Sequence, residues 1–250
     1  KWLKAHGSGR KDDVSASDEM NKDKSMKAEA VLEVEHLGSA YETRKGDVEA
    51  VRDVSFRVEA GETVGLVGES GCGKSTIAYG IVNFLGPNGK IVGGNVRFQG
   101  EELVGRSQEE LKKLRGDRIA MVFQDPMQAL NPSVRLGEQL SEVLTFHRDI
   151  SETEAWKKSV EMLKRVNMPD PEDVMRRYSH QISGGQQQRI GVARALAANP
   201  DYLLMDEPFG ALDALTREVL QQELLNLKKQ LKKTSNHTPD FGVNLPTCLF

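Results

Sequence analysis

The feature that most constrains this chain is a glycine-rich segment at 68–75, with the sequence Gly-Glu-Ser-Gly-Cys-Gly-Lys-Ser. It fits the P-loop pattern of Gly, four residues, Gly, Lys and Ser or Thr. An apolar run at 63–67 precedes it, and a helical pattern at 74–84 follows it. Glycines allow successive backbone N–H groups to close on an anion, and the helix N-terminus adds its dipole. The segment therefore predicts a phosphate-binding loop between a strand and a helix.

The residue types in this loop suggest individual roles. Lys74 is expected to reach the β- and γ-phosphates of a nucleotide, and the hydroxyl of Ser75 is expected to bind Mg²⁺. Cys72 is expected to be a small inward-facing residue, with a redox role as the alternative. The nucleotide is expected to contact the whole segment: Gly68, Glu69, Ser70, Gly71, Cys72, Gly73, Lys74, Ser75 and Thr76.

A second apolar strand, at 202–205, ends in the adjacent carboxylates Asp206 and Glu207. On its own this pattern is that of a strand followed by an acidic turn. A P-loop enzyme, however, needs a carboxylate at a strand end to hold Mg²⁺, and Asp206 fits that role. Glu207 can polarise the attacking water as a general base, which makes it the candidate catalytic residue.

Composition limits the class of protein. The chain has 250 residues, enough for one large α/β domain or for such a domain with an insert. Its formal charge of -3 gives no reason to expect a nucleic-acid partner. The two cysteines are far apart, so a disulfide framework is not expected and a reducing cytoplasm is the default. No apolar run reaches the ~18 to 20 residues that cross a bilayer.

Hydrophobic periodicity predicts alternating strands and helices. Such alternation favours a mainly parallel α/β sheet. A helical pattern at 133–177 interrupts it and predicts an inserted helical subdomain. The remaining expected strands lie at 31–37, 54–58, 95–98 and 118–123, and the remaining helices at 184–198 and 215–233.

Ser183-Gly184-Gly185-Gln186-Gln187-Gln188-Arg189 stands shortly before the acidic strand end and resembles the signature sequence of ABC ATPases. Residues 121–126 resemble the family's Q-loop, which contains Gln124, and residues 210–213 resemble its D-loop. Tyr41 lies where the family places an aromatic residue that stacks on adenine. The resemblance runs from about residue 31 to 233, with its motifs in the family's order.

The resemblance implies a P-loop core, a helical subdomain at about 130–185, and ATP and Mg²⁺ as cofactors. Gln124 would bind Mg²⁺ or its water and sense the nucleotide state. A second ABC subunit would pair head to tail with this one, and membrane permease subunits would hold the pair at the cytoplasmic face of the membrane. The remaining nucleotide contacts implied are Ser183, Gly184, Gly185, Gln186 and Asp213.

The transported solute is less clearly indicated. The P-loop sequence, residues 123–132 and Pro169-Asp170-Pro171 resemble subunits of peptide and nickel importers. Residues 206–213 instead resemble the corresponding segment in the ATP-binding subunits of osmolyte importers. We expect a peptide-type importer. One alternative is a soluble ABC ATPase of repair or translation, although the chain has neither two cassettes nor a coiled-coil insert. The other is a degenerate subunit that binds ATP without turnover.

Both ends of the chain depart from the family pattern. Residues 1–29 are polar and are expected to be disordered. The resemblance ends at about Thr234, and the tail at 235–250 has no strand pattern leading into His237. We expect a truncated or frame-shifted cassette that lacks the C-terminal part of the core. Loss of a core strand exposes apolar surface, which predicts low stability and little ATP turnover.

Overall fold

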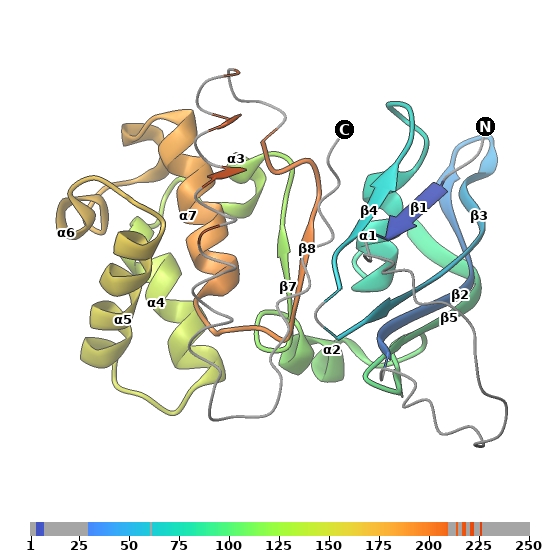
Figure 1. Cartoon of the computed structure of the whole chain (residues 1–250), viewed down its shortest axis with the longest axis horizontal. Helices are drawn as coiled ribbons and strands as arrows, with labels where there is room; N and C mark the ends of the chain where they lie inside the picture. The colour runs from blue at the N-terminus through green and yellow to red at the C-terminus, as the bar shows by residue number, and fades with distance from the viewer. Residues whose placement is uncertain are drawn as a thin grey trace, which may run out of the picture.

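The computed structural model describes residues 4–7, 30–60 and 62–209, together with the single positions 214, 217, 218, 221, 222 and 226. Figure 1 shows helices gathered at one end of this part of the chain and an antiparallel sheet at the other. Two strands, β7 and β8, run between these two groups. The fold is α/β with a separate helical subdomain, as the sequence indicates.

The antiparallel sheet has four strands in the order β3-β2-β5-β6. They are β2 (Ala30–Thr43), β3 (Gly46–Glu59), β5 (Gly89–Phe98) and β6 (Glu101–Glu102). Alternate residues of β2 point into the core, where Leu32 and Val34 are buried. The strands are longer than the apolar runs at 31–37, 54–58 and 95–98. Strands β3 and β5 begin before their runs with mostly exposed residues, and β2 continues past its run through Gly38, Ser39 and Ala40, which are buried although they are small or polar. The hydrophobic pattern of the sequence did not distinguish the strands of this antiparallel sheet from the strands of the parallel pair.

The P-loop joins strand β4 (Val64–Val67) to helix α1 (Lys74–Ile81). Strand β4 pairs antiparallel with β1 (Lys4–Gly7), which corrects the expectation of disorder for that part of the N-terminal segment. The physical reason is that the edge of β4 presents unpaired backbone N–H and C=O groups, which a polar chain can pair as well as an apolar one.

Strands β7 (Ile119–Val122) and β8 (Tyr202–Met205) form the parallel pair that the alternation predicts. Met121 lies opposite Leu204 and Val122 opposite Met205, so both strands end at the same edge. The amide of Asp206 extends the pairing by donating to the carbonyl of Val122, at 3.0 Å. This register places the residues that follow both strands side by side. The Q-loop thus reaches the acidic strand end.

The helical subdomain packs on an apolar cluster that it shares with β7 and β8, and in this cluster Leu136, Leu140, Leu163 and Ile190 are fully buried. Ser151 and Ser183 accept hydrogen bonds from the first-turn amides of α5 and α7 and so fix where these helices begin. The elements are α3 (Pro126–Ala129), α4 (Leu136–His147), α5 (Glu152–Arg165), α6 (Pro171–Val174), the 3₁₀ turn η1 (Ser179–Gln181) and α7 (Gly184–Leu196).

Two short helices were missed by periodicity, α3 and α2 (Gln108–Leu114). Each begins at a local cap: Asp125 accepts from the amide of Met127, and Ser107 forms a capping box with Glu110. The expected helix at 215–233, Asp213 and the tail at 235–250 lie outside the described residues, apart from the single positions named above. In the described part of the chain, no helix combines the length and apolar character needed to span a bilayer.

Candidate active site

The P-loop connects β4 to α1 with backbone conformations that need glycine. Gly73 has φ 100° and caps the helix, and Gly71 has φ 77°. A Cβ on Gly73 would lie 2.8 Å from the carbonyl oxygen of Ala50 on β3. Both the steric contact and the positive φ therefore exclude a side chain at this position. The loop is held by the Cys72 amide, which donates to the carbonyl of Glu69 at 3.2 Å.

Lys74 is folded back into the loop and is only 6% exposed. Its ammonium donates to the carbonyl oxygens of Gly68 and Glu69, at 3.0 and 3.1 Å. The same group lies 3.6 Å from Oε1 of Glu207. A buried lysine must be paired, and these three oxygens compensate its charge in the nucleotide-free chain. The ammonium is therefore at the centre of the loop, where an incoming phosphate would meet it.

Ser75 and Asp206 are brought together from distant parts of the chain. The Ser75 hydroxyl donates to Oδ1 of Asp206 at 2.8 Å. Asp206 is 1% exposed, and its second oxygen, Oδ2, is buried without a hydrogen bond of ordinary geometry. Burial raises the pKa of Asp206, and the charge of Glu207 adds to the rise, while hydrogen bonds from Ser75 and Tyr79 oppose it.

This arrangement fits Mg²⁺. A buried carboxylate oxygen without a partner is costly unless a cation completes it. The oxygens of Ser75 and Asp206 are hard ligands of the kind that Mg²⁺ takes, and Mg²⁺ needs few protein ligands when phosphate oxygens and water supply the rest. Within the described residues, no group of three His, Cys, Asp or Glu side chains could hold a metal alone. The metal would therefore arrive with a nucleotide.

Glu207 follows Asp206 in a left-handed conformation, with φ 40°, which a non-glycine residue rarely adopts. Gln124, which follows β7, donates its side-chain amide to Oε2 of Glu207 at 2.9 Å. The second oxygen of Glu207 is the one that faces Lys74. Strain of this kind at a half-buried carboxylate is typical of functional positions. The structure thus joins five predicted residues in one network: Lys74, Ser75, Gln124, Asp206 and Glu207.

The signature residues lie at the start of α7, apart from this network. Ser183 accepts from the amide of Gln186, and the side chain of Gln186 accepts from the amide of Ser183, which makes a capping box. Ser183 and Gly184 are exposed. The first turn of a 13-residue helix is therefore presented to solvent, where its amides can meet an anion from another molecule.

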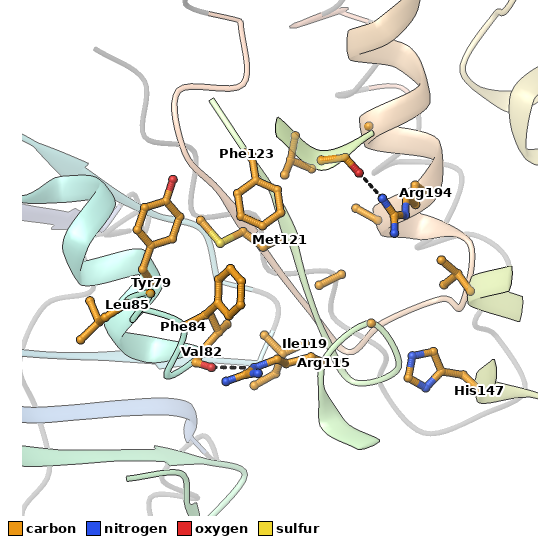
Figure 2. Close-up of a pocket in the computed structure, with 18 of the residues that line it drawn as sticks. Tyr79, Val82, Phe84, Leu85, Arg115, Ile119, Met121, Phe123, His147 and Arg194 are labelled. Carbon is orange, nitrogen blue, oxygen red and sulfur yellow. Dashed lines mark hydrogen bonds between the residues drawn. The ribbon is translucent and has the colours of Figure 1, made fainter. Parts of the chain in front are cut away.

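Tyr41 lies on β2, opposite Val48 and Gly89, and is half-buried. It lines a cavity of about 660 Å³ between α1, β7 and α7. Figure 2 shows the Tyr79 and Phe123 side chains in this cavity, from α1 and from the end of β7. Sequence reasoning missed Tyr79. Its position four residues after Ser75, on the same face of α1, was the signal that could have found it.

A family model described as "ABC transporter" matches residues 51–210, more than half of the chain. This chain belongs to the ABC transporter family. The match begins on β3 and ends after the acidic strand end, so it contains the P-loop, the Q-loop, the signature and β8. The ABC assignment made from the signature sequence is confirmed.

Curated relatives include peptide-transport ATP-binding proteins. The chain is 45% identical to the oligopeptide transport ATP-binding protein OppD of Escherichia coli (strain K12) over 211 residues, which cover 84% of the chain and 61% of OppD. It is 42% identical to the dipeptide transport ATP-binding protein DppD of Bacillus subtilis (strain 168) over 221 residues, which cover 86% of the chain and 65% of DppD. The chain thus spans less than two thirds of the length of these relatives.

Solved ABC cassettes share the fold. The dimeric structure of MJ0796, described as a bacterial ABC transporter cassette, has a TM-score of 0.72 and 30% identity, and the match covers 87% of this chain and 88% of that one. A dimeric post-hydrolysis state of the same cassette, bound to ADP and Pi, has a TM-score of 0.70 and 30% identity, covering 86% and 87%.

Proposed function

We propose that this chain is the ATP-binding and ATP-hydrolysing subunit of an ABC importer and that its solute is of the peptide type. The observation that carries the proposal is the network around the P-loop. It brings a phosphate-binding lysine, two Mg²⁺ ligands and a candidate base together at the ends of two parallel strands. The named peptide-transport relatives support the choice of solute over an osmolyte.

The network has a role for each residue in ATP hydrolysis. The P-loop amides and Lys74 bind the phosphates, and an incoming γ-phosphate competes with Glu207 for the Lys74 ammonium. Ser75 and Asp206 would hold Mg²⁺, which would supply neutralisation of charge on the phosphate oxygens. Glu207, once released from Lys74, accepts a proton from the attacking water. Gln124 orients the Glu207 carboxylate through its 2.9 Å hydrogen bond.

A second subunit would complete the site. The exposed first turn of α7 provides backbone amides that can meet the γ-phosphate bound by another chain, so that Ser183 and Gly184 close on the partner's nucleotide. The dimeric state of the related cassette MJ0796 supports this arrangement. In this proposal, ATP closes the head-to-tail pair and drives transport, and hydrolysis resets it.

The cavity between α1, β7 and α7 is our candidate docking surface for a membrane permease subunit, which would hold the chain at the cytoplasmic face of the membrane. Phe84 at its rim is 54% exposed. Phe123, the residue before Gln124, is among its lining residues, so a ligand here would contact the immediate neighbour of the nucleotide sensor. An apolar groove at this border suits a helix of the partner.

The charges of the groove indicate what such a helix would carry. Arg115 donates to the carbonyls of Val82 and Asn83, and Arg194 donates to the carbonyl of Ala129. Neither guanidinium forms an ion pair with a carboxylate within the described part of the chain. Burial lowers the pKa of both groups. A carboxylate partner stabilises the charge of a part-buried cation most strongly. We therefore propose that the permease helix is apolar and carries an acidic residue.

The function is tested by phosphate release from ATP by the purified full chain. We expect Mg²⁺-dependent turnover, and Glu207→Gln should slow it about 10²- to 10⁴-fold, as loss of a general base does, while ATP still binds. A Gln variant with the parental rate would exclude Glu207 as the base. Parental protein that binds ATP without turnover would favour the degenerate subunit instead.

The partner is tested by purifying the native complex and identifying its membrane subunits by mass spectrometry. Phe84→Glu places a negative charge at the rim of the groove, so we expect it to release the permease without changing ATP affinity. Recovery of integral permease subunits with the parent and their loss with Phe84→Glu supports the proposal. A complex without membrane subunits would favour the soluble ABC ATPase.

A further inference from the structure

Gln188 is a buried polar side chain in the wall of the groove. It lies on α7, is 2% exposed, and is one of the residues that line the cavity. Its side-chain nitrogen, Nε2, is buried and has no hydrogen-bond partner within the described part of the chain. Bulk water does not reach a buried atom, so this donor is unsatisfied, which costs free energy and is rare in folded proteins. An unsatisfied buried amide beside a cavity indicates a ligand that supplies the missing acceptor.

The missing acceptor is a feature of the groove and not of buried glutamines in this fold. Gln139, a similarly buried glutamine on α4, donates to the carbonyls of Asn131 and Val134, at 2.9 and 2.8 Å. Beside Gln188, by contrast, the wall of the cavity continues with Gly191, which follows almost one turn later on α7 and has no side chain. The last torsion of a glutamine side chain is soft, so the Gln188 amide can turn toward a group that enters this space.

The groove is rich in hydrogen-bond donors. The guanidinium groups of Arg115 and Arg194 line it together with Gln188, and none of the described lining residues is Asp or Glu. Figure 2 shows Arg194 on the opposite side of the cavity from Tyr79 and Leu85. Such a surface favours a partner that presents oxygen acceptors and negative charge. A helix presents both at its C-terminal end, where the last four carbonyls have no partner within the helix and the dipole is negative.

We propose that Gln188 determines how the permease helix docks: its amide donates to a backbone carbonyl in the last turn of that helix, which enters the groove with its C-terminal end against α7. This inference rests on the proposed docking of a permease subunit. The acidic residue of that helix then pairs with Arg115, which is held at the end of α1 by the carbonyl of Val82. An acidic residue nearer the N-terminus of a helix is also favoured by the helix dipole. The action of the signature on nucleotide does not contain this role of Gln188.

The test uses Gln188→Met, which removes the amide and keeps the length of the side chain. Permease subunits are purified from the native complex in detergent and freed of this chain, and binding of the full chain to them is measured by biolayer interferometry. We expect Gln188→Met to bind about 5- to 100-fold more weakly, because a buried carbonyl of the permease helix loses its donor. Without permease, the same variant should melt at or above the parental temperature, because the unsatisfied amide is gone.

Gln139→Met is the matched control. It removes a paired amide, so its melting temperature should fall. Gln139 is not among the described residues that line the cavity, so permease affinity should stay within about twofold of the parent. All binding is measured at a temperature at which each variant is folded. Parental permease affinity in Gln188→Met, or an equal loss in Gln139→Met, would overturn the role of Gln188. A lower melting temperature of Gln188→Met would overturn it too, since the amide would then have a partner within the chain.

The orientation of the helix is tested with Val143→p-benzoylphenylalanine, a photo-cross-linking substitution. Val143 lines the groove from α4, which packs against α7. Mass spectrometry of the cross-linked permease should identify the last turn of the docked helix, and cross-links confined to its first turn would overturn the orientation. The proposed function fails separately: if no permease subunit is recovered with the parent, docking and this inference both fail. Binding that is lost in Phe84→Glu and kept in Gln188→Met removes this inference alone.

Discussion

Ser75 and Asp206 stand 131 positions apart in the chain, yet the Ser75 hydroxyl donates to the Asp206 carboxylate at 2.8 Å. The contact shows that the start of α1 lies beside the end of β8. It ties the phosphate-binding loop to the acidic strand end before any ligand is present. The metal-binding half of the site is therefore formed by folding, not by the nucleotide.

The buried Asp206 carboxylate should make the nucleotide-free chain less stable as pH rises. Burial raises its pKa above the ordinary aspartate value. Between those two pKa values the folded state binds more protons than the unfolded state, so the free energy of unfolding falls as pH increases through this window. Asp206→Asn cannot ionise, and we expect a higher melting temperature than the parent at pH 7. The difference should shrink as the pH falls toward about 4. A constant difference at all pH values would contradict this explanation.

Two glycines of the P-loop should respond differently to alanine. Gly71→Ala and Gly73→Ala both place a side chain at positive φ, which costs about 1–2 kcal/mol. Only at Gly73 does the new Cβ also lie 2.8 Å from a backbone oxygen, that of Ala50. We therefore expect Gly73→Ala to lower the free energy of unfolding more than Gly71→Ala in nucleotide-free urea denaturation. Equal losses would mean that the contact with β3 relaxes.

The head-to-tail arrangement predicts that the signature acts on the partner's nucleotide. Ser183→Arg should block ATP-dependent dimer formation, because a long side chain then covers the exposed first turn of α7. ATP binding by the single subunit should be nearly unchanged. The measurement is size-exclusion chromatography with ATP in a Glu207→Gln background, in which the dimer persists. A stable dimer in the double variant would refute action in trans.

Much of the site could be predicted because each of its motifs is a short continuous stretch of sequence. The P-loop pattern located Lys74 and Ser75, and strand β8 has the bounds 202–205 that its apolar run predicts. The hydrogen bond between Gln124 and Glu207 could not be predicted from the residues alone, since it depends on the register of β7 against β8. Tyr79 was missed because its packing against Phe123, far away in the chain, becomes visible only in the fold.

The limits of the fold prediction have physical causes as well. Strand β3 begins before its apolar run because its first residues are exposed, and strand β2 continues past its run through the buried small residues Gly38, Ser39 and Ala40; backbone pairing does not require large apolar side chains in either place. The capping box of Ser107 and Glu110 starts a helix that is too short for periodicity to reveal. The same backbone pairing explains why the polar segment Lys4–Gly7 forms a strand on the edge of β4.

The central claim is that this P-loop binds ATP through Lys74, and nucleotide affinity tests it most directly. Fluorescent ATP analogue is titrated into the full chain and into Lys74→Ala, with melting temperatures as the control for folding. We expect the variant to bind at least about 10-fold more weakly, because the phosphates lose their charge-assisted partner. A folded Lys74→Ala variant whose affinity stays within about twofold of the parent would contradict the claim.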